Sequence, residues 1–159
     1  RCREIKGDYN PQEKIILVRR DYQASQGKEI FLSFENEDKT KLFSLLRLRI
    51  TDKGTKLMIE NAGDYMESPL RNTNTIGIIR EIHTYGIQTA IGKIATSAQH
   101  TGLGKKLIKE AERIAKTEFN IKKIAAISGV GARQYWRKNG YKLQNTYMVK
   151  KLHERIRAC

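Results

Sequence analysis

The segment from residue 102 to residue 117 carries its apolar residues at the spacing of an α-helix, which sets it apart from the rest of this chain. Six apolar side chains fall on one face of this segment: Leu103, Leu107, Ile108, Ala111, Ile114 and Ala115. Lysine, glutamate and arginine residues occupy the opposite face. The pattern predicts one long amphipathic helix that must pack against another apolar layer.

Before this helix, apolar and polar residues alternate in several short runs, which is typical of β-strands. The clearest run places Leu46, Leu48 and Ile50 on one face and Arg47 and Arg49 on the other. We expect strands over residues 14–20, 29–36, 42–50 and 78–85, a long loop over 51–75, and a short extra strand within 87–98. Because short turns separate the first three strands, an antiparallel meander is predicted.

Shorter elements are expected after the helix. Residues 123–128 predict a short buried strand, and residues 132–139 a short helix that ends at Gly140. Residues 141–152 predict one long final strand with a break near Asn145. Helices and strands in this mixture indicate an α/β (α+β) domain.

The bulk composition limits the class of protein. The chain has 159 residues, of which 39% are hydrophobic, enough for one compact domain with its own core. No apolar run approaches the ~20 residues that span a bilayer, and the charged start lacks the apolar stretch of a signal peptide. We therefore expect a soluble, cytoplasmic protein without a membrane partner. Since the first residue is Arg1 rather than Met, we also expect a piece of a longer chain.

Metal ligands are scarce in the sequence. The only cysteines are Cys2 and Cys159, near opposite ends, and the three histidines are widely spaced. Neither a disulfide framework nor a metal site is predicted from such a set.

The charge balance indicates a polyanionic partner. Lysine and arginine total 31 against 17 acidic residues, a formal net charge of +14. Such an excess favours phosphate backbones through counterion release. Several basic residues are also adjacent, among them Lys105 with Lys106 and Lys122 with Lys123. Nucleic acid is the favoured partner, although charge alone does not separate RNA from DNA or from an acidic protein.

The sequence QHTGLG at 99–104 directly precedes the predicted helix. Gly102 and Gly104 let the backbone turn tightly and approach a ligand without a Cβ in the way. The free N–H groups of the first helical turn would then point at one spot, with the positive end of the helix dipole behind them. A diphosphate suits such a site. Two glycines also occur where a loop is merely tight, so the identity of the ligand depends on the wider context.

Two motifs resemble those of the GNAT superfamily of N-acetyltransferases. QHTGLG is similar to the motif Q/R-x-x-G-x-G/A, whose backbone amides hold the pyrophosphate of acetyl-CoA in that superfamily. QYWRKNGY at 134–141 resembles its second motif, an aromatic pair followed by glycine and an aromatic. With REIHTYG at 80–86 and ISGVGARQYWRKNGY at 127–141, the chain resembles the C-terminal half of the Elongator catalytic subunit, of archaeal type.

The resemblance implies a GNAT acyl-CoA N-acyltransferase fold, in which a mixed, mostly antiparallel sheet is flanked by helices. It also implies that acetyl-CoA is bound by the strand before the loop, by the loop itself and by an aromatic residue on the short helix. In this sequence those positions are Glu81, Ile82, His83, Thr84, Gln99, Gly102, Leu103, Gly104, Lys105 and Trp136.

Tyr135, His83 and Glu81 are the candidate catalytic residues. Trp136 stands where most relatives have a tyrosine that can protonate the departing thiolate, and an indole is no practical acid. Trp136 would then only pack on the cofactor, with Tyr135 as the candidate acid, unless both aromatic residues belong to the core. Glu81 and His83 share one face of their strand by alternation and are the candidate bases, although a lone strand histidine is often structural.

In the Elongator family the substrate is tRNA, whose wobble uridine (U34) receives a carboxymethyl-type group at carbon 5. The resemblance implies this substrate, Elongator-type partners, and a radical S-adenosylmethionine half with an iron–sulfur cluster. The cysteine motif of that half is missing here, so we expect a linker remnant over 1–12, the acetyltransferase domain over 13–152 and a basic tail over 153–159. This piece would then be unable to modify uridine alone. Cys2 matches a segment that helps to bind zinc in relatives, but truncation beside it leaves no metal expected here.

Two other functions stay open on the sequence. A protein lysine acetyltransferase would use the same cofactor with an amine as acceptor, and activity on peptides without RNA would distinguish it. An RNA-binding module with a degenerate cofactor site would bind RNA with a steep salt dependence but would have no affinity for acetyl-CoA.

Overall fold

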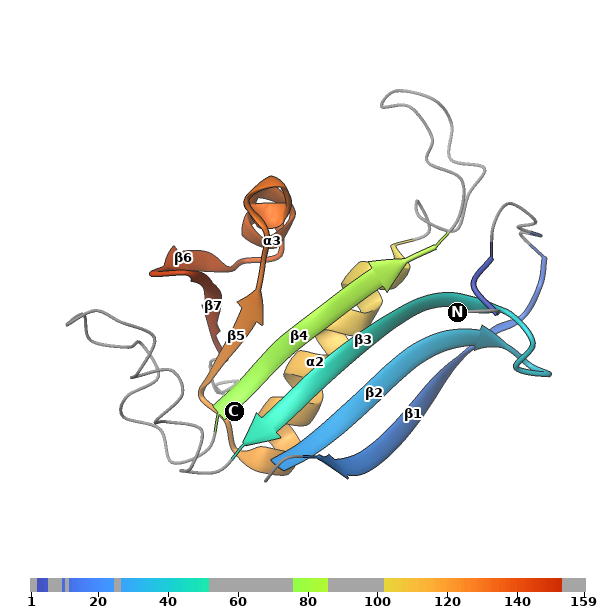
Figure 1. Ribbon diagram of the computed structural model, residues 1–159, viewed down its shortest axis with the longest axis horizontal. Helices are drawn as coiled ribbons and strands as arrows, with labels where there is room; N and C mark the ends of the chain where they lie inside the picture. The colour runs from blue at the N-terminus through green and yellow to red at the C-terminus, as the bar shows by residue number, and fades with distance from the viewer. Residues whose placement is uncertain are drawn as a thin grey trace, which may run out of the picture.

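The computed structural model describes residues 3–5, 10, 12–24, 27–51, 76–85 and 102–152. In these residues a seven-stranded sheet has the order β1-β2-β3-β4-β5-β7-β6 (Figure 1). Its strands are β1 Ile15–Ala24, β2 Gly27–Asn36, β3 Leu42–Thr51, β4 Ile76–Thr84, β5 Lys123–Ile127, β6 Lys142–Gln144 and β7 Tyr147–Lys151. β4 and β5 are parallel, and the other neighbouring strands are antiparallel. The mixed, mostly antiparallel sheet is confirmed.

The predicted meander of β1, β2 and β3 is present, and β4 continues it. Leu32 of β2 pairs with Leu46 of β3, and Ile30 pairs with Leu48. These four side chains are fully buried and belong to one apolar cluster. Alternation therefore directs the leucines and isoleucines of both strands to the same face of the sheet.

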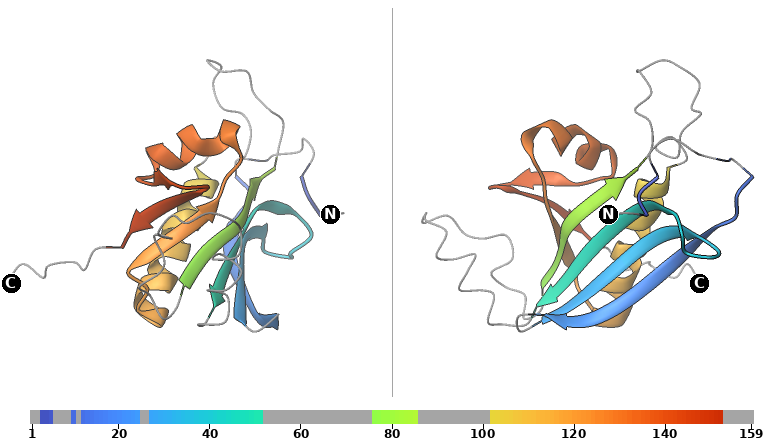
Figure 2. Two further views of the ribbon diagram at one scale, coloured as in Figure 1. Left: turned by 60° about the vertical axis from the view of Figure 1, so that its left-hand side comes forward. Right: turned by 45° about the vertical axis from the view of Figure 1, so that its right-hand side comes forward.

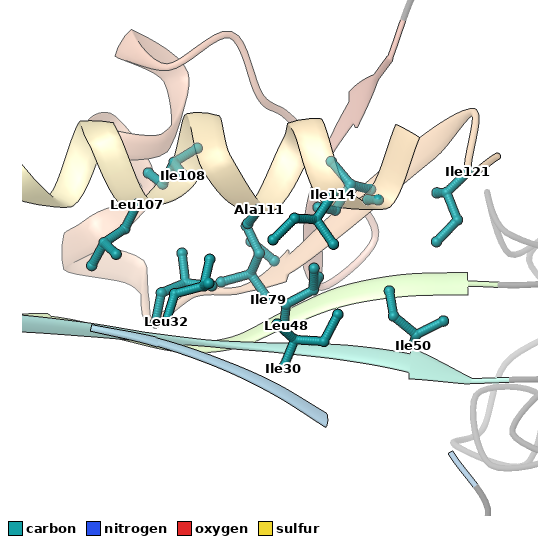
Figure 3. Close-up of a cluster of buried hydrophobic side chains, with 14 of the residues drawn as sticks. Ile30, Leu32, Leu48, Ile50, Ile79, Leu107, Ile108, Ala111, Ile114 and Ile121 are labelled. Carbon is teal, nitrogen blue, oxygen red and sulfur yellow. The ribbon is translucent and has the colours of Figure 1, made fainter. Parts of the chain in front are cut away.

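Helix α2, Leu103–Phe119, lies across that face (Figures 1 and 2). Its apolar stripe packs on isoleucine and leucine side chains of β2, β3 and β4 (Figure 3). Each fully buried side chain of this kind contributes about 1.5–3 kcal/mol of transfer free energy. The helix ends at Asn120, which has a φ of 52°, a left-handed conformation that asparagine tolerates better than most residues. The predicted helix is confirmed and extends slightly beyond its expected end.

The end of the chain differs from the prediction in one respect. A 3-10 turn, Val130–Ala132, leads into helix α3, Arg133–Lys138, and Gly140 with a φ of 86° follows it as expected. The single strand predicted over 141–152 is wrong, because the chain reverses and forms the hairpin of β6 and β7. Gln144 pairs with Tyr147, and Asn145 between them has a φ of 54°. Asparagine at positive φ is typical of two-residue hairpin turns.

Residues 3–5 contact the domain. Glu4 forms a parallel bridge with Leu42, and Ile5 packs in a small apolar cluster with Phe43 and Leu103. Among the described residues, neither helix is long and apolar enough to cross a membrane. The predicted loop over 51–75 lies outside the described residues except for its first position, which belongs to β3. The extra strand within 87–98 and the tail over 153–159 lie outside them entirely.

Candidate cofactor site

β4 has different partners along its two edges. β3 pairs with it from Ile76 to Thr84, whereas β5 pairs with it only from Gly77 to Ile79. Beyond that point β4 and β5 diverge (Figure 1). From Arg80 onward, no strand in the described part of the chain pairs with the β5 side of β4. Backbone N–H and C=O groups on such an edge can bond an extended ligand in the manner of an added strand.

A bulge at Arg80 accompanies this divergence. Consecutive residues of β3 pair with Ile79 and Glu81, so Arg80 is an extra residue on β4. A bulge bends its strand and increases the local twist. It also shifts the alternation by one position, because Ile79 and Ile82 both pack on the apolar cluster under α2. Glu81 consequently lies on the opposite face of the sheet.

Gly104 lies where β4, α2 and α3 meet. A Cβ at this position would lie 2.8 Å from the Tyr135 hydroxyl and 3.2 Å from Oγ1 of Thr84. The first distance is shorter than real Cβ contacts, so a larger residue would have to displace Tyr135. Glycine allows this close approach without displacing the Tyr135 side chain. Gly104, Thr84 and Tyr135 line one spot at the end of β4, beyond the point where it separates from β5.

The start of α2 presents backbone N–H groups. Gly102 precedes the helix with a φ of 71°, which glycine adopts without strain. Its carbonyl accepts the first helical hydrogen bond, at 3.0 Å from the Lys106 nitrogen, so the N–H groups of Leu103, Gly104 and Lys105 precede the helical ladder. The first turn contains no acidic residue, and Lys105 is exposed. This end of the helix is electrostatically suited to an anion.

The two aromatic residues of α3 have different environments. Tyr135 is 41% exposed and its hydroxyl faces Gly104, and partial burial raises its pKa above the ordinary phenol value. Trp136 is only 2% exposed, and its ring packs edge-on against Tyr141 with the ring centroids 4.9 Å apart. The structure thus places Tyr135 at the candidate site and the Trp136 side chain in the core. Contact of Trp136 with a cofactor stays a prediction.

Glu81 and His83 lie together on the face of β4 that points away from α2. Nε2 of His83 is 3.1 Å from Oε1 of Glu81, and the His83 ring stacks on Tyr85 with centroids 6.1 Å apart. Nη1 of Arg47 lies 3.3 Å from the other oxygen of Glu81. Both side chains are partly exposed, so they can meet a ligand or water. Among the described residues, no three potential metal-binding side chains gather as a metal site would require.

Proteins of known sequence are similar to nearly the whole of this chain. The tRNA uridine(34) acetyltransferase of Dehalococcoides mccartyi is 43% identical over 96% of this chain, which covers 32% of that protein. The tRNA uridine(34) acetyltransferase of Methanocaldococcus infernus is 42% identical over 96% of the chain, covering 28% of that protein. Elongator complex protein 3 of Homo sapiens is 44% identical over 94% of the chain, covering 25% of that protein.

Solved structures give the same result. The archaeal Methanocaldococcus infernus Elp3 with an N-terminal deletion is 41% identical and superposes with a TM-score of 0.68, over 89% of this chain and 30% of that one. The chain corresponds to a portion of these proteins. A bacterial toxin that is 10% identical, with a TM-score of 0.51 over 87% of this chain and 92% of its own, shares the fold alone. No model of a known protein family matches. The chain spans about a quarter to a third of the curated relatives it matches.

The structure brings several residues of the expected site into one region. Ile82, Thr84 and Gly104 lie together beyond the point where β4 separates from β5, and Gly102 directly precedes α2. Glu81 and His83 lie on the other face of the same strand. Leu103 is 3% exposed, and its side chain packs in the cluster with Ile5 and Phe43. Gln99 lies outside the described residues. Arg47 is not among the residues that the sequence predicts for the site. The signal available in the sequence is its place on the polar face of β3, the strand that pairs with β4.

Proposed function

We propose that this chain is the acetyl-CoA-binding acetyltransferase domain of a tRNA uridine(34) acetyltransferase. The observation that carries the proposal is the meeting of Gly104, Thr84 and Tyr135 at the end of β4, beyond the point where β4 leaves β5. Here a helix start and a phenol lie close to the part of β4 on whose β5 side no described strand pairs. The relatives at 42–43% identity have this activity in their names.

The residues present fit acetyl-CoA as a substrate. The N–H groups at the start of α2 would hold its pyrophosphate, with Lys105 adding positive charge. The β5 side of β4 from Arg80 to His83, on which no described strand pairs, would bond the amides of the pantetheine arm. The Tyr135 hydroxyl, whose pKa is raised by partial burial, would donate a proton to the departing thiolate.

Isothermal titration with acetyl-CoA tests this site. A Gly104→Glu variant should lose measurable binding, because its side chain would enter the space beside the Tyr135 hydroxyl. Gly129→Glu is the matched control, since a Cβ at Gly129 meets nothing within 4 Å and its backbone is extended. Equal affinity in both variants, or no heat with the unchanged chain, would contradict the proposal.

The acceptor that we propose is tRNA. The net charge of +14 favours a polyanion, and a cavity of about 500 Å³ on β5, β6 and β7 is lined by lysines: Lys123, Lys142, Lys150 and Lys151. The whole protein would join the acetyl group to the wobble uridine, using a radical half supplied by the rest of the polypeptide. If this chain alone made carboxymethylated uridine, the proposal that the radical half is supplied by the rest of the polypeptide would be contradicted. Acetylation of lysine peptides without RNA would instead favour a protein acetyltransferase.

A further inference from the structure

The face of the sheet opposite α2 contains a carboxylate with no solvent exposure, that of Glu29 on β2. Three arginines surround it: Nε of Arg47 at 3.0 Å, Nη1 of Arg80 at 3.4 Å and Nη1 of Arg49 at 3.5 Å. Burying a carboxylate is unfavourable unless such partners compensate for its lost hydration. An apolar residue of similar size at position 29 would pack in the sheet without this cost of dehydration. Stability alone therefore does not account for a buried glutamate with three arginines.

Arg47 connects this buried carboxylate to the candidate site. Its Nε bonds Oε1 of Glu29, and its Nη1 bonds Oε2 of Glu81 at 3.3 Å. The other oxygen of Glu81 lies 3.1 Å from Nε2 of His83. Pairing of Arg47 with Glu81 follows from the bulge at Arg80, which turns Glu81 to this face. The four side chains form a continuous series from β2 through β3 to the exposed end of β4.

A second buried carboxylate on β2 provides a comparison. Glu35 has no exposure and bonds Arg20 at 2.6 Å, Ser33 at 2.6 Å and Arg3 at 2.9 Å. Within the described residues, this network ends at Arg3 and Arg20 and reaches no histidine or second carboxylate. The two networks are alike in burial and in the use of arginine. They differ in that only the Glu29 network continues to the candidate site.

We propose that Arg47, held in place by buried Glu29, is a positioning residue that fixes the Glu81 carboxylate against Nε2 of His83 and so leaves Nδ1 of His83 as the proton acceptor. A carboxylate on one ring nitrogen determines which tautomer a neutral histidine adopts. Arg47 suits the role because its planar fork bonds two carboxylates at once in a fixed geometry.

The reaction step rests on the proposed function. For hydrolysis, in which water takes the place of the acceptor, the thioester would lie along β4 beyond Ile79, where His83 reaches it from one face of the sheet and Tyr135 from the other. Nδ1 of His83 takes a proton from a water molecule as the water oxygen forms a bond to the acetyl carbonyl carbon. The carbon–sulfur bond then breaks, and the Tyr135 hydroxyl gives its proton to the departing thiolate. Acetate and CoA leave, His83 releases its proton to solvent, and Tyr135 is reprotonated from solvent.

Nitrogen-15 NMR of the histidine rings tests the positioning directly. The chain has three histidines, so a His83→Gln variant assigns the His83 signals. At alkaline pH the unchanged chain should show His83 with its proton on Nε2 only. Arg47→Gln should give a mixture of both tautomers. Arg20→Gln is the matched control, because it removes the equivalent bond to the other buried carboxylate, and it should leave His83 unchanged.

Kinetics provide the second readout. In acetyl-CoA hydrolysis with tRNA present, Arg47→Gln should lower kcat by about tenfold while the Kd for acetyl-CoA changes by less than about twofold. Arg47→Lys keeps the charge and should restore part of kcat. Arg20→Gln should leave kcat unchanged, even where its melting temperature falls as much as that of Arg47→Gln.

Separate outcomes decide the two proposals. Absence of acetyl-CoA binding by the unchanged chain would refute the proposed function, while the His83 tautomer would still decide the role of Arg47. A single Nε2-protonated tautomer that persists in Arg47→Gln would overturn the positioning proposal. An equal loss of kcat in Arg20→Gln and Arg47→Gln would do the same, because it would show a general effect of sheet stability.

Discussion

The sheet formed by β2, β3 and β4 buries side chains on both faces, but the two faces are built from opposite kinds of side chain. The face under α2 holds isoleucine and leucine residues that form one apolar cluster. The opposite face of β2 and β3 holds Glu29, Ser33, Glu35, Arg47 and Arg49, whose polar groups bond one another. Packing on the apolar face stabilises the fold but is not directional. Hydrogen bonds and ion pairs on the charged face fix the orientation of side chains at the end of β4. Stability and chemistry are thus separated across one sheet.

The largest effect is expected from neighbouring leucines on opposite faces. Leu46 is fully buried in the cluster under α2, whereas Leu45 is 9% exposed and belongs to no apolar cluster of the described residues. Leu46→Ala should lower the free energy of unfolding by about 2–5 kcal/mol, because it removes methyl groups and leaves a cavity. Leu45→Ala should cost about half as much or less. Urea denaturation of both variants checks this, and equal losses would break the distinction between the faces.

The charged face should dominate the acid sensitivity of the fold. Burial works against ionisation of Glu35, but hydrogen bonds from Arg20, Ser33 and Arg3 lower its pKa to about 2, from 4.5. The unfolded chain binds a proton at this carboxyl at higher pH than the folded chain does. The pairing therefore stabilises the fold fully above about pH 4.5, and this contribution is lost as pH falls towards 2.

Glu35→Gln tests this dependence. The variant should be less stable than the unchanged chain by about 2–3 kcal/mol near neutral pH, and the difference should shrink between pH 4.5 and 2. Thermal melts across that range measure it. Glu37→Gln is the control, because the Glu37 side chain is 61% exposed and its one ion pair among the described residues is with Lys14 at the surface. A pH-independent difference for Glu35→Gln would contradict the proposed cause.

Much of this fold could be predicted because its regular elements follow hydrophobic spacing. The alternation on β3 and the apolar stripe on α2 each specify an element and its buried face. The bulge at Arg80 could not be predicted, since one extra residue leaves no mark in the pattern of a strand with mixed composition. Alternation placed Glu81 and His83 on one face, as found. Only the paired register shows that this face is the one away from α2.

Two local features were missed for similar reasons. Asn145 was read as a break within a strand, whereas its positive φ makes it a hairpin turn. Neighbouring residues on a helix point about 100° apart, so the sequence of α3 could not show which aromatic faces the core. Packing of Trp136 on Tyr141 decides this, and Tyr135 is left beside Gly104.

Tyr135 and Trp136 should respond differently to loss of their polar groups. Tyr135→Phe should lower kcat for acetyl-CoA hydrolysis by about 10–100-fold with little change in acetyl-CoA affinity, because it removes the proton donor but keeps the ring. Trp136→Phe should mainly lower the melting temperature, because the indole is buried. Steady-state kinetics with calorimetry separate the two. A loss of kcat in Trp136→Phe without a loss of stability would place Trp136 at the reacting atoms instead.

The smallest effect is expected at the lysine-lined cavity at the other end of the sheet. Lys142 pairs with Val149 across β6 and β7, and Lys151 follows two positions later on the same face. If this cavity binds phosphates, replacing both lysines with glutamine should weaken tRNA binding and reduce the slope of log affinity against log salt by about 1 for each lysine. Lys14→Gln is the control, because Lys14 is 70% exposed and lies on the far side of the sheet, before β1. Filter binding over a salt series measures the slopes. The same slope in all variants would place the tRNA contacts away from this cavity. The slope reports counterions released from phosphates that bound lysines neutralise, so removing a lysine that contacts no phosphate leaves it unchanged.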